Sequence, residues 1–340
     1  MTLSKPRILF FNPVRHALDA YRKLSSIAQT EVISSKNRAE FFEDVKSKYK
    51  DIVAIYSTSS SYAVTGKFDK ELIQKLPPSL KFICHNGAGY DQIDIDACTA
   101  RGVQVTNAPD PVTDATADLT LFLLLGALRQ LNPALVSLRQ GNWKKGLDFG
   151  HDPQGKTLGI IGMGRIGRAV KRRVEPLGIK TIYYNRNPLP ELEAAGARYV
   201  SFDELLKASD IISLHVPLNA KTRHLISDVE ISKMKDGVVI VNTARGAVID
   251  EAAMAAALES GKIASVGLDV YEREPEINEV LRKNERALLI PHLGTHTTET
   301  LAKMESLAME NARRGCFGEP LLTVVAEQMR SVNGLTNGHS

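Results

Sequence analysis

The stretch TLGIIGMGRIGRAV, residues 157–170, constrains the fold of this chain more than any other feature. Its apolar start predicts a buried strand, and the amphipathic residues that follow predict a helix. Between them, Gly162 permits a tight turn, Gly164 lets a pyrophosphate approach the backbone, and Gly167 lets the helix pack closely on the sheet. The helix N-terminus, with Arg165 and Ile166 in its first turn, would offer N–H donors to the anion. The stretch favours a dinucleotide-binding unit over the alternative of a purely structural turn.

Short apolar runs alternate with helical patterns along almost the whole chain. The predicted strands are residues 7–11, 51–56, 81–85 and 103–106 in the first third, then 157–161, 181–184, 211–216, 238–242, 265–270 and 287–290. Continuous rather than alternating hydrophobicity is typical of parallel strands that are covered on both faces. We therefore expect doubly wound α/β layers. Ser201 and Asp250 are predicted helix N-caps, and Gly261 is a predicted C-terminal cap.

Composition narrows the classes of protein. With 340 residues the chain is long enough for two domains, and its 43% hydrophobic and 24% charged residues are typical of globular proteins. Three scattered cysteines show no metal-ligand spacing, so we expect no metal site and a reduced, cytoplasmic setting. The apolar run at 121–128 is too short to span a bilayer and no secretory signal is recognised, so no membrane partner is expected.

The net charge of +4 does not point to nucleic acid, because basic and acidic residues are interleaved along the chain. One basic cluster, RAVKRRVEP at 168–176, is interpreted as the solvated face of an amphipathic helix. Ile166, Val170 and Val174 would form its buried face.

The choice of cofactor depends on the residue about 20 positions after the glycines, where an NAD site usually has an acid. This chain has Asn185 there, followed by Arg186. No carboxylate is present to repel a 2′-phosphate, and a guanidinium can pair with one. We therefore expect a preference for NADPH, with NAD as the alternative cofactor. The competing interpretation of Arg186 is an ordinary exposed arginine.

Polar side chains follow three consecutive predicted strands. Arg245 follows 238–242, and His292 follows 287–290. The strand between them, 265–270, ends with Asp269 and is followed by Glu272 and Glu274. In open parallel sheets, ligands bind at these carboxyl ends. Arginine binds carboxylates in a bidentate manner, and a carboxylate orients a histidine and favours its protonated form. Each residue alone has a structural explanation, but together they suit hydride transfer to a 2-oxo acid with a proton from histidine.

With these motifs the chain resembles the D-2-hydroxyacid dehydrogenase family, and within it the fungal glyoxylate/hydroxypyruvate reductases. The resemblance runs from about residue 81 to 315 and rests on GMGRIG, LHVPLNAKTRHLI, VNTARGAVIDE, GLDVYEREP and PHLGTHTTET. It implies Arg245, Glu274 and His292 as the catalytic residues. Glu272 and Glu276 become bystanders, and His296 belongs to the start of the next helix.

The resemblance also implies the residues that bind the ligands. Asp269 would lie near the nicotinamide carboxamide, and the N–H groups of Ala88 and Gly89, in HNGAGYDQID, would hold the substrate carboxylate alongside Arg245 and His292. The remaining implied cofactor contacts are Val216, Pro217, Thr222, Thr243, Ala244 and Gly294.

The family's fold implies two doubly wound domains. A Rossmann cofactor domain at 111–299 would be inserted in a flavodoxin-like substrate domain made of 1–110 and 300–328, followed by a loose polar tail at 329–340. Helices near 113–131 and 298–313 would connect the domains. Because members are usually homodimers through the cofactor domain, the nearly all-apolar helix at 113–131 suits a domain junction or a dimer contact.

The expected reaction is NADPH-dependent reduction of a small 2-oxo acid, glyoxylate or hydroxypyruvate, to the D-2-hydroxy acid. Gly146 stands where related mammalian-type reductases have a second tryptophan besides Trp143, so a bulkier substrate such as mandelate is an alternative. A D-3-phosphoglycerate dehydrogenase is another alternative. A nucleotide-sensing, corepressor-like binding protein is the alternative from another class.

Overall fold

The computed structural model describes residues 5–329, and the chain divides into two compact units. The first unit is Met1–Val112 with Thr297–Ser340, and the second is Thr113–His296. The predicted boundaries, at 110/111 and 299/300, lie within three residues of these positions. Residues 330–340 of the predicted tail lie outside the described residues. Just before them, residues 326–329 are helical, and the buried Gln328 side chain accepts a hydrogen bond from Val105 N at 2.7 Å.

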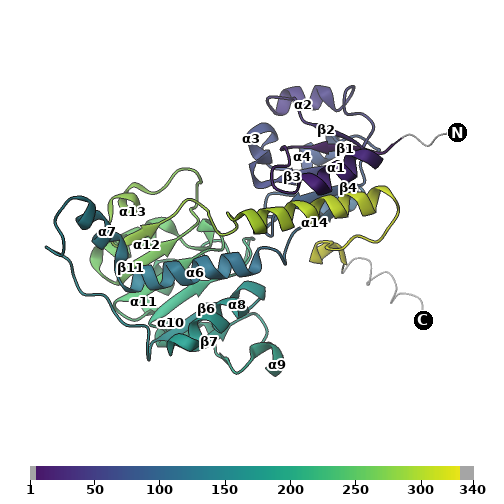
Figure 1. Ribbon diagram of the computed structural model, residues 1–340. Helices are drawn as coiled ribbons and strands as arrows, with labels where there is room; N and C mark the ends of the chain where they lie inside the picture. Colours follow the sequence, from purple (N-terminus) through teal and green to yellow (C-terminus); the bar gives the residue numbers. More distant parts are fainter. Residues whose placement is uncertain (1–4, 330–340) are drawn as a thin grey trace. The chain divides into compact units, whose positions relative to one another are not determined.

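The first unit is built on a five-stranded parallel sheet in the order β2-β1-β3-β4-β5 (Figure 1). Its strands are β1 (Arg7–Phe10), β2 (Gln29–Val32), β3 (Ile52–Thr58), β4 (Phe82–Asn86) and β5 (Gln104–Thr106). One face packs on α1 (Leu18–Ile27) and α14 (Thr298–Cys316). The other packs on α2 (Arg38–Asp44), α4 (Lys70–Lys75) and α5 (Ile95–Ala100), while the short α3 (Tyr62–Thr65) follows β3. Strand order and two covered faces confirm the expected flavodoxin-like fold.

The second unit is built on a seven-stranded parallel sheet in the order β12-β11-β10-β9-β6-β7-β8. Its strands are β6 (Thr157–Ile161), β7 (Lys180–Tyr184), β8 (Arg198–Tyr199), β9 (Ile211–Leu214), β10 (Val238–Asn242), β11 (Ile263–Leu268) and β12 (Ala287–Leu289). This is the order expected of a Rossmann domain with one additional strand.

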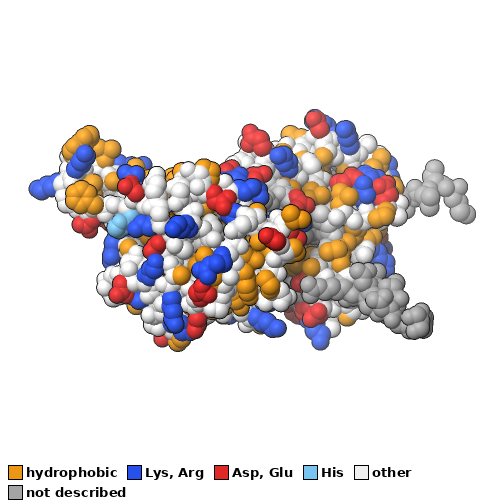
Figure 2. Space-filling model, turned by 90° about the horizontal axis from the view of Figure 1, so that it is seen from below, with side chains coloured by type: hydrophobic (Ala, Val, Ile, Leu, Met, Phe, Trp, Pro, Cys, Tyr) orange, Lys and Arg blue, Asp and Glu red, His pale blue; other side chains and the backbone are white. Residues whose placement is uncertain are grey.

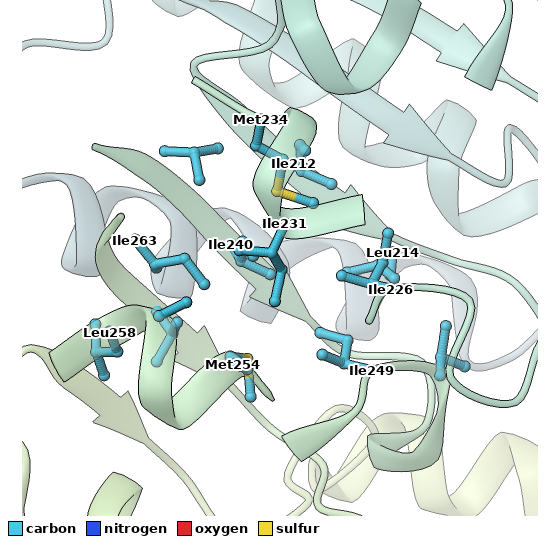
Figure 3. Close-up of a cluster of buried hydrophobic side chains, with 14 of the residues drawn as sticks. Ile212, Leu214, Ile226, Ile231, Met234, Ile240, Ile249, Met254, Leu258 and Ile263 are labelled. Atoms are coloured by element: carbon cyan, nitrogen blue, oxygen red, sulfur yellow. The ribbon is translucent and has the colours of Figure 1, made fainter. Parts of the chain in front are cut away.

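Helices cover both faces of the second sheet. One face packs on α10 (Phe202–Ala208), α11 (Asp228–Lys233), α12 (Glu251–Ser260) and α13 (Glu279–Lys283). Figure 3 shows the hydrophobic side chains of this face, with Ile240 of β10 among them. The other face packs on α6 (Thr113–Leu128) and α8 (Arg165–Val174). The short α9 (Glu191–Ala194) precedes β8, and α7 (Leu131–Arg139) follows α6. Because both faces are buried, the central strands carry the continuous apolar runs seen in the sequence.

The ten predicted strands are all present, with ends displaced by at most a few residues. Strands β2 and β8 were not predicted. The sequence of β2 is QTEV, which lies at a sheet edge and is exposed or half-buried, and β8 has only two residues. Neither has the apolar run on which the prediction depends.

The predicted helix boundaries need one correction. The expected helix at 113–131 ends at Leu128, because Gln130 adopts a left-handed conformation and α7 starts at Leu131. Ser201, Asp250 and Gly261 are confirmed as caps. No single described helix is both long and apolar enough to cross a membrane, and α6 and α7 meet that criterion only as a pair bent by 73°.

The basic cluster on α8 also differs from its prediction. Val170 and Val174 are buried, as predicted, whereas Ile166, expected on the same buried face, is half-buried. Arg173 pairs with Asp114 and Asp118. Lys171, expected in solvent, is instead buried, and its Nζ donates to the carbonyl oxygen of Ala195 at 2.7 Å. The ammonium group is compensated by that carbonyl and by Glu175, 2.5 Å away.

Candidate active site

The glycine-rich turn after β6 leaves space for an anion. Gly162 has a φ of +100°, and a Cβ there would lie 2.7 Å from the carbonyl carbon of His215. A Cβ on Gly167 would collide with the carbonyl oxygen of Gly162, whereas a Cβ on Gly164 would meet nothing within 4 Å. Gly164 is the N-cap of α8 and supplies no capping side chain. The protein's own packing therefore requires the first and third glycines, and the open space at the second suits a pyrophosphate.

The turn lies at the point where strand order reverses. β6 has β7 on one side and β9 on the other, so the loops after β6 and β9 border the crevice in which such sheets bind ligands. Val216 and Pro217 follow β9, and Thr222 braces the same loop, donating from Oγ1 to Pro217 O at 2.6 Å. His215, at the start of this loop, is half-buried with its Nδ1 shielded from solvent, and desolvation of the ring lowers its pKa to about 3 and keeps the ring neutral.

Asn185 lies directly beside the glycine-rich turn. Its Oδ1 accepts a hydrogen bond from Met163 N at 2.7 Å, which fixes the orientation of the side-chain amide. The Nδ2 group therefore faces away from the turn as a donor. Arg186 is exposed next to it. The NADPH preference that the sequence predicts from these two residues stays a prediction.

Arg245, Glu274 and His292 follow β10, β11 and β12, which are neighbours in the sheet. His292 Nδ1 lies 2.8 Å from Glu274 Oε2, so Nε2 is the ring nitrogen left to face a substrate. The two side chains are 43% and 35% exposed, respectively, so a ligand has access to the pair. The structure thus brings together the predicted histidine and carboxylate.

The charge state of Glu274 depends on its neighbours. Burial alone would raise the pKa of this carboxyl, but the hydrogen bond and charge of His292, the Tyr271 N–H and the charge of Arg245 outweigh it. The pKa of Glu274 therefore lies below its ordinary value, and the carboxylate is ionised wherever the histidine can act as an acid. The Arg245 guanidinium itself donates from Nη1 to Ala244 O at 2.8 Å.

Asp269 holds the turn that carries His292. His292 has a φ of +53°, and its N–H donates to Asp269 O at 2.8 Å. The Asp269 carboxylate accepts N–H bonds from Leu293 at 2.5 Å and Gly294 at 2.8 Å. Burial, with the side chain 1% exposed, raises the pKa of Asp269. Its implied contact with the nicotinamide carboxamide stays a prediction, as does that of Gly294 with the cofactor.

The Arg245 loop is fixed by the predicted Thr243 together with Asn242, Thr120 and Gly246, which sequence reasoning missed. Asn242, buried at the end of β10, accepts from Ala244 N at 3.0 Å and donates to Arg245 O at 2.9 Å. Thr243 Oγ1 lies 2.8 Å from Thr120 Oγ1 of α6. A Cβ on Gly246 would overlap the backbone of Tyr271, so only glycine lets this loop approach the one that bears Glu274. The sequence did contain a signal for Asn242, because it is the one polar residue at the end of an otherwise apolar strand.

The other acids and the second histidine differ in their surroundings. Glu272, a predicted bystander in catalysis, binds Arg223 at 2.6 Å and His224 at 3.0 Å through its carboxylate, which ties the loop to the one after β9. Glu276 is exposed, and so is His296, which lies just before Thr297, the N-cap of α14. In residues 5–329 no group of three or more potential ligands is placed to hold a metal ion.

The predicted substrate loop, Ala88 and Gly89, belongs to the first unit and follows β4. Gly87 O accepts from Ala108 N at 2.8 Å, and Ala88 O accepts from the Asn107 side chain at 2.7 Å. These bonds fix the peptide planes of the loop. Its binding of a carboxylate stays a prediction.

Comparison with known proteins identifies the family. The model for D-isomer specific 2-hydroxyacid dehydrogenases, NAD-binding domain, matches residues 121–294. The chain belongs to this family. It is 48% identical to glyoxylate reductase 1 of Saccharomyces cerevisiae, with 95% of each chain covered. It is 49% identical to 4-methyl-2-oxopentanoate reductase A of Aspergillus oryzae, with 95% of this chain and 98% of the relative covered.

Solved structures of dehydrogenases agree with this assignment. A glyoxylate reductase from Paecilomyes thermophila has a TM-score of 0.93 and 52% identity, with 96% of this chain and 100% of that chain covered. D-mandelate dehydrogenase of Rhodotorula graminis has a TM-score of 0.87 and 33% identity over 95% and 98% of the chains. A Sinorhizobium meliloti glyoxylate/hydroxypyruvate reductase in complex with NADP and malonate has a TM-score of 0.84 and 32% identity over 95% and 98%. The chain is thus an oxidoreductase of the D-2-hydroxyacid dehydrogenase family.

The lowered pKa of Glu274 predicts how acid affects this dehydrogenase. Because the pKa of Glu274 is lower in the folded chain than in the unfolded chain, ionisation of this carboxyl stabilises the fold. The full stabilisation is present above the ordinary pKa of 4.5, and it is lost as the pH falls through the folded-state pKa. We expect E274Q to lower the melting temperature at pH 7 by no more than about 4 °C, because solvent screens the pair, and we expect the difference to shrink below about pH 4.5. E276Q, two residues further on and exposed, is the control. A constant difference from pH 7 to pH 3 would contradict the assignment.

Proposed function

We propose that this chain is a cytoplasmic, NADPH-preferring reductase that converts a small 2-oxo acid, glyoxylate or hydroxypyruvate, to the D-2-hydroxy acid. The observation that carries the proposal is the 2.8 Å contact between His292 and Glu274, in the same unit as Arg245 and the glycine-rich turn. The three cysteines are unpaired, which suits a reducing compartment.

The roles of the residues follow from their chemistry. Bound NADPH supplies the hydride that reaches the 2-oxo carbon. Arg245 binds the substrate's carboxylate and polarises its carbonyl, and the N–H groups of Ala88 and Gly89 hold the same carboxylate. His292 donates the Nε2 proton to the developing alkoxide, while Glu274 stabilises the imidazolium before transfer and orients its ring.

Two classes of substrate, which differ in size, are candidates. The relatives named glyoxylate reductase favour a two- or three-carbon acid. The equally similar Aspergillus oryzae relative is named for 4-methyl-2-oxopentanoate, so a branched aliphatic acid is the second candidate. A mandelate-like substrate has weaker support, from a 33% identical neighbour. Gly146, the residue on which the alternative of a bulkier substrate rests, lines a hollow beside α7 that includes none of the three proposed catalytic residues.

The first experiment measures NADPH oxidation with glyoxylate, hydroxypyruvate and 4-methyl-2-oxopentanoate by the natural chain and by H292A. We expect glyoxylate or hydroxypyruvate to give the highest kcat/KM. Loss of the proton donor should lower kcat by about 10²–10⁴-fold and leave the Kd for NADPH unchanged. H296A, which changes the exposed histidine four positions later, is the matched control. A near-normal rate in H292A would refute its role, and a preference for the branched acid would select the second candidate.

The preference for NADPH is proposed from Asn185 and Arg186. With Oδ1 held by Met163 N, the Asn185 amide can donate to a 2′-phosphate, and the Arg186 guanidinium can pair with it. The neighbour solved with NADP shows that the family includes proteins that bind this cofactor.

Replacing Asn185 by Asp tests this preference. The aspartate would still accept from Met163 N, while its second oxygen would place a negative charge where the amide donor was. We expect the ratio of kcat/KM for NADPH to that for NADH to fall about tenfold or more, because like charges a few ångströms apart repel strongly at an effective dielectric of about 20. N187D adds the same charge two residues further on and should have a smaller effect. An unchanged ratio in N185D would place the 2′ site elsewhere.

We also propose that the enzyme is a homodimer formed through the second unit. Exposed hydrophobic side chains gather at the end of this unit that carries α7 and the following loop (Figure 2). The exposed hydrophobic residues of α7 and the following loop are Leu131, Leu135, Leu138, Trp143 and Phe149. Exposed apolar groups in such a cluster mark protein–protein contacts in soluble proteins.

The proposed assembly is tested by sedimentation at micromolar concentration. The natural chain should have the mass of two copies, and the double variant L135D/L138D should have the mass of one, because buried charges oppose association. L18D, which adds a charge at a similarly exposed leucine of α1, should remain dimeric. A monomeric natural chain would refute the proposal.

A further inference from the structure

The loop that carries Glu274 is held at both of its ends by one buried carboxylate. Glu251, the first residue of α12, is 8% exposed. Its Oε2 accepts from Glu272 N at 2.8 Å, and its Oε1 accepts from Asn278 N at 2.9 Å. The two N–H groups lie six positions apart in the sequence, so one side chain closes the loop between them.

The middle of this loop has little packing of its own. Residues 273–276 are all exposed, and Glu276 N donates to Arg273 O at 2.9 Å to form a tight turn. Tyr271 N donates to Glu274 Oε1 at 3.0 Å, which orients the carboxylate relative to the start of the loop. The position of Glu274 therefore depends on where the two ends of the loop are fixed.

A carboxylate is the side chain that this arrangement requires. Its two oxygens are both acceptors, and each faces an N–H donor in a buried setting where charge-assisted hydrogen bonds are strong. A glutamine has one acceptor oxygen and an NH₂ group that would face the second N–H without a bond. An aspartate keeps the charge, but its side chain is shorter by one methylene and cannot reach both ends.

We propose that Glu251 is a positioning residue for the reaction: by closing the 272–278 loop, it places the Glu274 carboxylate against His292 Nδ1. Glu251 touches neither substrate nor cofactor in this scheme and acts only through Glu274. The inference rests on the proposed acid–base role of Glu274 and His292.

The test compares E251Q with the natural chain and with E259Q. Glu259 lies on the same helix and is exposed, so it is a matched control. We expect E251Q to lower kcat about tenfold to a hundredfold, because a misplacement of about 1 Å in an active site can have that effect. KM for NADPH should stay within about twofold, and E259Q should behave as the natural chain. Unchanged kcat in E251Q would overturn the proposal.

A double-mutant cycle separates positioning from general loss of structure. If Glu251 acts through Glu274, E251Q should cost little further kcat in an E274Q background, whereas independent effects multiply. The basic limb of the kcat/KM pH profile should move to lower pH in both single variants, because the protonated imidazole loses its carboxylate partner. The proposal would be refuted if the two substitutions lowered kcat multiplicatively. It would also be refuted if the basic limb of the kcat/KM pH profile moved in E274Q but not in E251Q.

A measurement that does not depend on turnover separates the proposed role of Glu251 from the proposed function. In an NMR titration, the His292 ring signal, identified by its absence in H292A, should titrate at lower pH in E251Q and E274Q than in the natural chain. If no 2-oxo acid is reduced by the natural chain, the proposed function fails, and this titration still decides the role of Glu251. If E251Q does not fold, E251D is measured instead and should shift the titration in the same direction. No shift in a folded variant would overturn the proposal.

Discussion

The hydrogen bond between His292 and Glu274 joins two loops that leave neighbouring strands, and the architecture around it serves to keep those loops in place. A 2.8 Å contact between two exposed side chains is weak by itself, because water competes for both groups. It persists only if the backbone on each side is fixed independently. The parallel sheet provides the coarse placement by bringing the ends of β10, β11 and β12 to one edge.

Finer placement comes from buried carboxylates that accept backbone N–H groups. Asp269 binds the turn of His292, and Glu251 binds both ends of the Glu274 loop. In the first unit Glu305 of α14 binds three consecutive N–H groups, of Arg15, His16 and Ala17. Burying an ion is costly, and two or three N–H donors offset that cost while fixing loops that lack apolar side chains to pack. The same device thus recurs where the fold has to hold irregular backbone.

Much of this architecture was predictable from the sequence, because its signals are local. The glycine spacing, the apolar runs and the polar residues after each run predicted the sheets, the turn and His292 near a group of acids, and the family resemblance selected Glu274 among those acids. The bracing contacts were not predictable in this way. Glu251 lies 21 and 27 positions from the residues whose N–H groups it binds, and an acid at the start of a helix has a sufficient local explanation in the helix dipole. Lys171 was misplaced for the same reason, since its partner Ala195 lies 24 positions away.

The division of the chain into two units also separates two tasks. The glycine-rich turn, Arg245 and the His292–Glu274 pair all belong to the second unit, whereas the predicted carboxylate loop at Ala88 and Gly89 belongs to the first. The contacts that brace the pair, from Asn242, Glu251 and Asp269, lie entirely within the second unit. On the proposed roles, residues of the first unit that meet a substrate can change without disturbing the contacts that brace the pair. Such a separation suits a family in which relatives carry names as different as glyoxylate reductase and 4-methyl-2-oxopentanoate reductase.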